Sequence, residues 1–566
     1  MNEEEKPRIG IFICHCGVNI GAVVNVPEVV EYAKTLPNVV HAEGNLYTCS
    51  SEGLSKIKEA IKKYQLTRVV VASCTPRTHE PLFRSACEEA GLNKYLFHMA
   101  NIREHCSWVH PKEPEKATEK AKEMVKMAAA KAALLEPQEE PEIDVEPTAL
   151  VLGGGISGMT AAVSLANQKF KVHLVEKENE LGGKLRELYK LYPNDCYTSD
   201  VLEEFKQAVR SNPNITVHTS STLKQSEGFI GNFKVTIDHK GKEEPFDVGT
   251  IIVATGADVL KPNGTYCYGQ SKNVVTQLEL ENIFKEKTIG KPKNVIMIQC
   301  VGAREEKEGG RNYCSRICCA VAVKNALQIK ELSPETEVFI LYRDMQTYGR
   351  EFEEQYEKAR QNCVQFLRYD AENPPEVIQC SDGKFMVKVH DILLNATLEL
   401  DADLVVLSTP LIQREEAKEL SKLLKVPLGA DGFFFEAHVK LRPVDFATEG
   451  IFICGTAHSP KTIAESIAQA YAAASRAGIP MALKRVRTEA ITAFVNEELC
   501  TGCGTCVKLC PYNAIQKDEY GIARVNDVLC KGCGVCAASC PEKAINMRHF
   551  SDKQVLAEAT AALGGA

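Results

Sequence analysis

The chain has 566 residues, enough for several domains, and it carries 23 cysteines but only one tryptophan. Its formal net charge of -8 and its isoelectric point near 6.0 argue against a nucleic-acid partner. No run of about 18 apolar residues exists, and the acidic, polar start does not resemble an export signal, so we expect neither a membrane span nor secretion. In the reducing, cytoplasmic setting that this predicts, cysteines bind metals more often than they form disulfides.

Residues 1–136 are predicted to form an α/β domain that binds iron and sulfur. Apolar runs suited to strands lie at 9–13, 39–46, 68–72 and 95–100, with helical patterns between them. One cysteine follows each predicted strand, namely Cys14, Cys49, Cys74 and Cys106. Because ligands bind at the carboxyl ends of strands in open α/β sheets, these thiols could hold a 4Fe–4S cluster, with Cys16 able to replace Cys14. Buried or partly reactive thiols are the alternative.

An acidic stretch punctuated by proline, 137–147, is predicted to be a linker to a dinucleotide-binding domain. The first part of that domain, 148–290, has a short strand, a GxGxxG turn at Gly153, Gly155 and Gly158, a helix and a second strand ending at Glu176. This context favours binding of a dinucleotide pyrophosphate at the helix start and of a ribose hydroxyl at Glu176.

Features typical of flavoproteins with two dinucleotide folds point to FAD. A second glycine pair follows Glu176, a buried strand ends in Ala-Thr-Gly, and in the second part of the domain, 402–487, a strand ends at Gly455 and opens a helix. Many flavin disulfide reductases have Asp after that glycine, whereas this chain has Thr456, which still offers a hydroxyl. The predicted FAD-binding residues are Gly153, Gly155, Ile156, Ser157, Gly158, Glu176, Lys177, Gly182, Gly183, Lys184, Ala254, Thr255, Gly256, Gly455, Thr456 and Ile463.

The domain inserted at 291–401 is predicted to be Rossmann-like, but it lacks the second GxGxxG that would bind NAD(P)H. A predicted strand runs into a loop with only one glycine and with Cys300, Cys314, Cys318 and Cys319. These thiols could ligate iron, form a redox disulfide or be unrelated buried cysteines. We favour a 4Fe–4S cluster beside the flavin. Lys324, in the following helix, could reach a flavin edge or be an ordinary solvated lysine.

Residues 488–548 are predicted to be a ferredoxin domain with two 4Fe–4S clusters, followed by a tail at 549–566. The run CxxCxxCxxxCP occurs twice, and in this pattern the fourth cysteine of each run binds the other cluster. One predicted ligand set is Cys500, Cys503, Cys506 and Cys540. The other is Cys530, Cys533, Cys536 and Cys510.

Several stretches resemble one family, the A-type subunit of heterodisulfide reductase, which is an electron-bifurcating flavoprotein. They are QCVGAREE and YCSRICCAVAVKNA, which flank Gly309, GTAHSPKTIAESIAQA at 455–470, and ICHCG, LYTCS, VVASCTPRTHEPLF and ANIREHCSWVH in the first 110 residues. The resemblance covers nearly the whole chain and implies that Cys300, Cys314, Cys318 and Cys319 bind a cluster next to FAD. Longer members carry a second ferredoxin inserted in the flavin domain, which is absent around 231–245 here.

Together these observations predict a multidomain α/β protein. It should comprise an N-terminal α/β domain, a thioredoxin-reductase-like flavin domain with two dinucleotide folds and an inserted Rossmann-like domain, and a C-terminal two-cluster ferredoxin domain. The predicted cofactors are FAD and 4Fe–4S clusters: two in the ferredoxin domain, one near the flavin and one N-terminal. The predicted function is that of an iron–sulfur flavoprotein oxidoreductase that belongs to a larger complex and splits electron pairs between a high-potential acceptor and ferredoxin.

The predicted partners are other redox proteins. The resemblance implies B- and C-like subunits of heterodisulfide reductase, ferredoxin, and a hydrogenase, formate dehydrogenase or similar electron donor reached through an adaptor subunit, with the complex as a dimer. A non-bifurcating electron conduit in a quinone-linked complex and a pyridine-nucleotide-dependent flavoenzyme are the alternatives, and a mainly structural hub is a third. The degraded glycine loop near Gly302 speaks against the pyridine-nucleotide enzyme.

Overall fold

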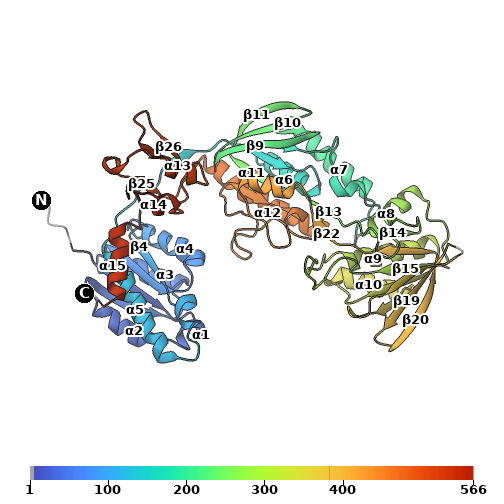
Figure 1. Cartoon of the computed structure of the whole chain (residues 1–566), viewed down its shortest axis with the longest axis horizontal. Helices are drawn as coiled ribbons and strands as arrows, with labels where there is room; N and C mark the ends of the chain where they lie inside the picture. The colour runs from blue at the N-terminus through green and yellow to red at the C-terminus, as the bar shows by residue number, and fades with distance from the viewer. Residues whose placement is uncertain (1–5, 382, 565–566) are drawn as a thin grey trace. The chain divides into compact units, whose positions relative to one another are not determined.

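The computed structural model describes residues 6–381 and 383–564, which fold into two compact units (Figure 1). Unit 1 combines the residues up to Glu142 with those from Arg487 onward, and unit 2 is the continuous stretch Ile143–Val486. The last two residues of the predicted tail, Gly565 and Ala566, lie outside the described residues. No helix in the described part of the chain has the length and apolar character needed to cross a membrane.

The N-terminal part of unit 1 is a parallel four-stranded sheet between two layers of helices. The strands, in the order β2-β1-β3-β4, are β1 (Ile9–Cys14), β2 (Val39–Asn45), β3 (Arg68–Ser73) and β4 (Phe97–Asn101). Helices α2 (Val26–Lys34) and α5 (Pro114–Ala133) pack together, as do α3 (Ser51–Lys63) and α4 (Pro76–Glu89). The short helix α1 (Val18–Gly21) and the π-helix η1 (Arg103–Ser107) follow strand ends. Strands β1 and β3 are almost wholly buried, as expected for a parallel sheet covered on both faces.

The C-terminal part of unit 1 is built from two small hairpin-like halves. Its elements are η4 (Glu497–Leu499), the helices α13 (Thr505–Leu509) and α14 (Val535–Ala538), and the strands β25 (Ala493–Val495), β26 (Ile515–Lys517), β27 (Ala523–Val525) and β28 (Ile545–Met547). Strand β25 pairs with β28, so the first and last strands close the module, and β26 pairs with β27.

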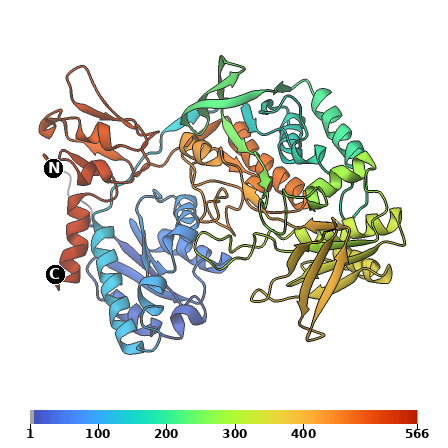
Figure 2. The ribbon, with the colours of Figure 1, turned by 45° about the vertical axis from the view of Figure 1, so that its right-hand side comes forward.

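The tail forms helix α15 (Asp552–Ala562), which lies along α5 in both views (Figure 1 and Figure 2). Gln554 donates a hydrogen bond to the Leu134 carbonyl at 2.9 Å, and His98 lies 3.3 Å from Glu558. The fully buried Lys131 ammonium sits 3.8 Å from the centre of the Phe550 ring. Through these contacts the tail fastens the C-terminal module to the N-terminal sheet.

The flavin-domain half of unit 2 is a parallel sheet in the order β23-β12-β6-β7-β8. Its strands are β6 (Thr148–Leu152), β7 (Lys171–Val175), β8 (Ile215–His218), β12 (Thr250–Val253) and β23 (Ile451–Ile453). Helices α6 (Ile156–Asn167) and α12 (Ile463–Leu483) pack together against it. The antiparallel strands β9 (Ser221–Phe229), β10 (Asn232–His239) and β11 (Lys242–Val248) contact β6 and β7. The remaining elements are β5 (Glu142–Asp144), β24 (Arg485–Arg487), η2 (Gly183–Arg186), η3 (Gly455–Ala457), α7 (Thr198–Arg210) and α11 (Ala417–Leu424).

The inserted half has its own parallel sheet, ordered β14-β21-β15-β16-β17. These strands are β14 (Val274–Thr276), β15 (Asn294–Ile298), β16 (Glu337–Tyr342), β17 (Gln365–Arg368) and β21 (Leu404–Leu407). An antiparallel sheet of β18 (Glu376–Gln379), β19 (Phe385–Asp391) and β20 (Ala396–Ala402) accompanies it, together with α8 (Gln277–Glu286), α9 (Cys318–Leu332) and α10 (Arg350–Gln361). The two crossings between the halves, β13 (Ala257–Val259) and β22 (Leu411–Gln413), pair with each other. The inserted sheet therefore reaches beyond the predicted 291–401 on both sides, because β14 and β21 are recruited by long-range pairing.

Candidate functional sites

The three glycines of the GxGxxG turn have different structural roles. A side chain on Gly153, whose φ is +106°, would lie 2.4 Å from the Ala254 carbonyl, and one on Gly158 would lie 1.7 Å from the Gly153 carbonyl. These two positions need glycine for packing. A side chain on Gly155 would meet no protein atom within 4 Å, so that position opens onto free space at the start of α6. The first N–H groups of α6 are available there for an anionic group such as a pyrophosphate.

Glu176 stands at the end of β7, where the sequence places it for a ribose hydroxyl. Its carboxylate accepts hydrogen bonds from the backbone N–H groups of Gly154, at 2.6 Å, and Glu178, at 2.9 Å. The side chain is buried, and these two bonds fix it beside the glycine turn. A carboxylate accepts about four hydrogen bonds, so acceptor capacity remains for a diol.

The predicted FAD-binding residues converge on one cavity of about 970 Å³. Those that line it are Gly153, Gly155, Ile156, Ser157, Glu176, Lys177, Gly182, Gly183, Lys184, Ala254, Thr255, Gly256, Thr456 and Ile463. Gly158 and Gly455 lie behind the wall, and a side chain on Gly455 would collide with the Ser157 hydroxyl at 2.2 Å. A cavity of this size, with an open cradle at Gly155, fits a dinucleotide.

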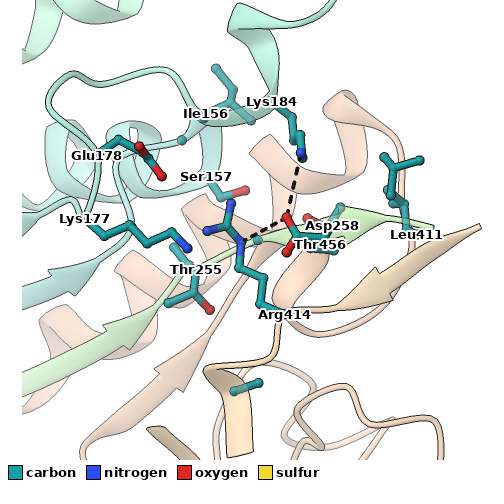
Figure 3. Close-up of a pocket in the computed structure, with 18 of the residues that line it drawn as sticks. Ile156, Ser157, Lys177, Glu178, Lys184, Thr255, Asp258, Leu411, Arg414 and Thr456 are labelled. Carbon is teal, nitrogen blue, oxygen red and sulfur yellow. Dashed lines mark ion pairs between the residues drawn. The ribbon is translucent and has the colours of Figure 1, made fainter. Parts of the chain in front are cut away.

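The sequence did not identify several groups in the cavity wall. Asp258 on β13 lies between Lys184, at 3.7 Å, and Arg414, at 3.8 Å (Figure 3). Lys461 is buried, and burial, assisted by the nearby Arg316, lowers its pKa to about 8. Lys461 donates to the Ser459 hydroxyl at 2.8 Å. The stretch GTAHSPK was noted as a motif, but only the fold brings its lysine into the cavity.

Four cysteines of the inserted domain, all between β15 and the first turn of α9, are brought together beside this cavity, and we call them the inner thiol site (Cys300, Cys314, Cys318, Cys319). Cys300 follows β15, and the two adjacent cysteines form the first turn of α9, so that Cys318 lines the cavity itself. Burial, with a smaller contribution from the neighbouring thiols, raises the pKa of Cys300 and Cys318 and raises that of Cys319 to about 12. Such thiols are inert when protonated and become thiolates when a metal pairs with them.

Two arginines, Arg304 and Arg343, lie near the Cys300 thiol of the inner thiol site. Arg304 lies against the Cys300 thiol and pairs with Asp344 at 2.8 Å. The Cys319 thiol lies 3.6 Å from the Asp344 carbonyl. Positive charge at this position compensates thiolates and the negative charge of a reduced cluster.

Lys324 is buried and does not line the cavity, so the interpretation of it as a solvated lysine is wrong. It is buried in an ion pair with Glu281 and donates to the Lys190 carbonyl at 2.9 Å. Glu281 in turn accepts from the Tyr189 N–H at 2.9 Å. This buried pair joins α8 and α9 to the flavin domain and serves packing of the cavity wall.

The eight ferredoxin cysteines separate into two groups of four around two small cavities. One cavity is lined by Cys500, Cys503, Cys506 and Cys540. The other is lined by Cys510, Cys530, Cys533 and Cys536. In each group the fourth cysteine comes from the other run, which is the crossed arrangement that the spacing predicts.

The N-terminal cysteines converge in a set different from the one predicted. Cys14, Cys16, Cys49 and Cys74 lie close together, and we call them the N-terminal thiol site: each of the first three raises the pKa of Cys74, which burial brings to about 11. The Cys14 sulfur accepts the Cys16 N–H at 3.2 Å, and Arg103 donates to the Cys16 sulfur at 3.6 Å.

Cys106 is apart from this set. Its position in the π-helix η1 turns its thiol toward α5, where it donates to the Ala117 carbonyl at 3.0 Å, and it is fully buried. The prediction that Cys106 lies with Cys14, Cys49 and Cys74 is therefore wrong, and Cys16 occupies the fourth position. The CxC spacing of Cys14 and Cys16 was the available signal.

Within residues 6–381 and 383–564, no three His, Cys, Asp or Glu side chains are spaced to bind a single metal ion. A four-iron cluster is larger than one ion, so its thiolates lie farther apart than the ligands of a single metal.

Comparison with known proteins supports these interpretations. Residues 147–477 match the family model described as pyridine nucleotide-disulphide oxidoreductase, and residues 493–547 match the 4Fe-4S dicluster domain. These matches confirm the predicted flavin and ferredoxin domains and the cofactors FAD and 4Fe–4S clusters.

Curated relatives resemble the chain over most of its length. One from Methanopyrus kandleri, an iron-sulfur subunit of CoB--CoM heterodisulfide reductase that is designated A 2, is 41% identical and covers 91% of this chain and 92% of its own. One from Methanothermobacter marburgensis, the A-type subunit of H(2):CoB-CoM heterodisulfide,ferredoxin reductase, is 41% identical over 99% of this chain and 98% of its own. A third, from Methanocaldococcus jannaschii, is the A-type iron-sulfur subunit of CoB--CoM heterodisulfide reductase and is 39% identical over 98% of each.

Proposed function

Because this chain belongs to the family of A-type heterodisulfide reductase subunits, an oxidoreductase family, we propose that it splits electron pairs in a heterodisulfide-reductase-like complex. Of each pair, one electron would reduce a high-potential acceptor and the other would reduce ferredoxin. The observation that carries this proposal is that Cys318 of the inner thiol site lines the same cavity as the FAD-binding residues. A two-electron cofactor and a one-electron carrier would then share one site.

The cofactors would be held by the groups already described. FAD, which supplies two-electron chemistry, would lie with its pyrophosphate at Gly155 and a ribose at Glu176. The two ferredoxin sets and the inner thiol site would each hold a 4Fe–4S cluster. The N-terminal thiol site would hold a fourth, with Cys16 rather than Cys106 as a ligand.

The chain's own residues would tune this site by charge and by exclusion of water. Arg304 beside Cys300 favours the more negative, reduced form of a cluster. Lys461, with its pKa lowered by burial to about 8, can exchange a proton in the cavity near neutral pH. The buried Lys324–Glu281 pair and the packed start of α9 exclude water from this side of the flavin cavity.

The partners in this proposal are those that the resemblance implies. They are B- and C-like subunits that reduce a heterodisulfide, a hydrogenase, formate dehydrogenase or similar donor with its adaptor, and ferredoxin, in a cytoplasmic, dimeric complex. The name of the M. marburgensis relative contains both a heterodisulfide and ferredoxin, which supports two acceptors.

Anaerobic analysis of cofactor content, followed by a coupled reduction assay, tests the proposal. We expect about one FAD and about 16 iron per chain, since four clusters of four iron are assigned. In the complex, reduction of ferredoxin should require the high-potential acceptor. About eight iron per chain would confine clusters to the ferredoxin module, and reduction of ferredoxin without the second acceptor would support a simple electron conduit instead.

A pyridine-nucleotide-dependent flavoenzyme is the second candidate, favoured only by the description of the matching family model. In this chain the loop after β15 carries Cys300 and a single glycine in place of a phosphate-binding turn. We therefore expect NADH and NADPH alone to leave the flavin absorbance unchanged. Rapid bleaching by either nucleotide would favour this candidate.

A further inference from the structure

We infer that Arg316 is a positioning residue that holds the inner thiol site at a fixed separation from the flavin cavity. The inference rests on the proposed function, because it takes the inner thiol site to carry a cluster beside FAD. Arg316 stands between Cys314 and Cys318, and its backbone N–H donates to the Cys314 sulfur at 3.3 Å. Its φ of +63° lies in the left-handed region, which a long side chain adopts only when its surroundings compensate for the strain.

The Arg316 side chain leaves its own loop and binds the start of the flavin helix α12. One guanidinium nitrogen donates to the Pro460 carbonyl at 3.2 Å, and the other donates to the Glu465 carboxylate at 2.6 Å and to the Tyr348 hydroxyl. The planar guanidinium holds acceptors on two segments at once, which a lysine ammonium on a flexible stem does less rigidly.

The segment that Arg316 binds at the start of α12 is part of the cavity wall. Glu465 also accepts the Thr462 N–H at 2.7 Å in the capping box that starts α12. Lys461 and Ile463, on either side of that cap, line the cavity. The Glu465 carboxylate therefore caps α12 and also accepts the hydrogen bond from Arg316 of the cysteine loop.

The opposite wall of the cavity is formed by the cysteine loop that carries Arg316. Ile317 and Cys318 follow Arg316 directly and line the cavity from the inserted domain. Arg316 therefore spans the two walls between which an electron would pass. Electron transfer slows steeply as the separation of its partners grows, so loosening this link should slow transfer without removing either cofactor.

The competing explanation is that Arg316 affects electron transfer only through its positive charge. Substitution by lysine distinguishes this effect from positioning. Arg316→Lys keeps the positive charge beside Lys461 and Glu465 but loses the fork that binds two segments. Arg316→Gln loses the charge as well. If positioning matters, both variants slow transfer; if only charge matters, the lysine variant behaves like the native protein.

The test uses the full-length protein loaded with FAD and clusters. A light pulse on deazaflavin with EDTA as electron donor reduces the flavin, and the rate at which the flavin then passes an electron to iron–sulfur is followed by absorbance. Arg350→Lys and Arg350→Gln serve as matched controls, because Arg350 is an exposed arginine of the same inserted domain that pairs with Glu354. We expect both Arg316 variants to slow this step at least about tenfold with FAD and iron content unchanged, and both controls to match the native rate.

Unchanged rates in both Arg316 variants with full cofactor content would overturn the inference, as would a native rate in the lysine variant alone. If the variants lose FAD or iron, Glu465→Gln decides the matter, because glutamine still caps α12 while its bond to Arg316 loses charge: slower transfer supports the inference and a native rate overturns it. Native protein with about eight iron per chain would overturn the proposed function along with the inference, whereas about 16 iron and unaltered rates would overturn the inference alone.

Discussion

The inner thiol site and the ferredoxin module present the same ligand chemistry in different surroundings. In the inner thiol site Cys318 lines the flavin cavity, and the Arg304 guanidinium lies against the Cys300 thiol. In the ferredoxin module each group of four lines a small cavity of its own that contains none of the predicted FAD-binding residues. Exposure does not separate the sites, because each group includes one exposed cysteine, namely Cys314, Cys503 or Cys533. Four thiolates define a cluster site, but what lies next to the thiolates decides whether the cluster exchanges electrons with an internal cofactor or an external protein.

The largest effect should come from removing one cysteine ligand from each kind of site. Cys319→Ser should lower flavin-to-cluster electron transfer at least about 100-fold while FAD remains bound, since the cluster beside the flavin is lost. Cys503→Ser should leave that first transfer at the native rate and abolish only a ferredoxin cluster signal. Electron paramagnetic resonance, iron analysis and flash reduction measure both effects.

Cys196→Ser is the control for these ligand substitutions, because Cys196 is exposed and belongs to none of the thiol groupings. Equal transfer rates in Cys319→Ser and Cys503→Ser would contradict the distinction between an internal and an external site.

Removing FAD from the flavin cavity should leave the ferredoxin module intact. Gly155→Val places a branched side chain in the open space at the start of α6, where no protein atom is within 4 Å of its first carbon. The fold should tolerate it, and FAD affinity should fall on the order of 100-fold, because the pyrophosphate cradle is filled. Fluorescence titration with FAD measures the affinity.

Iron content and the resonance signals of the ferredoxin clusters provide the control for Gly155→Val. Native FAD affinity in this variant would show that the glycine turn does not hold the dinucleotide.

The tail that fastens the ferredoxin module to the N-terminal sheet contains a buried histidine, so we expect acid to destabilise unit 1. Burial between His98 and Lys131 lowers the pKa of His549 to about 3, below the value near 6.5 of an unfolded chain, so His549 is neutral in the folded state. From about pH 6.5 downward the unfolded state binds the extra proton, and unit 1 should lose up to about 1.4 kcal/mol of stability per pH unit until about pH 3. Glu558, whose pKa lies below its usual value despite burial because His98 and Lys131 are near, adds to this loss at lower pH.

His549→Asn is the informative variant, because His549 has a φ of +69°, which asparagine tolerates, and asparagine does not titrate. Denaturant unfolding between pH 7 and pH 5 should show a shallower loss in the variant than in the native protein. The same slope in both would locate the acid sensitivity elsewhere.

The smallest expected effect concerns the arginine beside the inner thiols. Arg304→Gln removes a positive charge next to Cys300, so the reduced inner cluster should be less stable by about 1 kcal/mol and its midpoint potential lower. A redox titration followed by resonance spectroscopy measures the shift, and the ferredoxin potentials serve as an internal reference. An unchanged inner potential would show that Arg304 does not tune this site.

Local patterns were sufficient for parts of the molecule where structure and chemistry depend on neighbouring residues. The strand, glycine turn and helix from β6 to α6 and the strands of the N-terminal sheet occur where apolar runs and turn residues predict them. The crossed grouping of Cys510 and Cys540 followed from the spacing, because the doubled CxxCxxCxxxCP run is the known ligand pattern of two-cluster ferredoxins.

Features that depend on contacts between distant residues could not be predicted from the sequence. The sheet of the inserted domain takes up β14 and β21 through pairing that no local pattern encodes. Cys106 follows a strand as its three companions do, but one π-helical turn redirects its thiol. Arg316 reads as an ordinary loop residue, and its role depends on the place of Glu465 in the fold.

The docking of α15 on α5 makes unit 1 a discontinuous domain, into which the entire flavin unit is spliced. Within unit 1 the points of exit and return adjoin each other: Thr488 donates to the Pro141 carbonyl at 3.0 Å, and Arg487 pairs with Glu142 at 3.0 Å. The flavin unit could therefore be excised and replaced by a short connector without stretching the remaining chain. The shortened protein would keep the N-terminal and ferredoxin thiol groupings while lacking any flavin, and would isolate the one-electron half of the molecule for study.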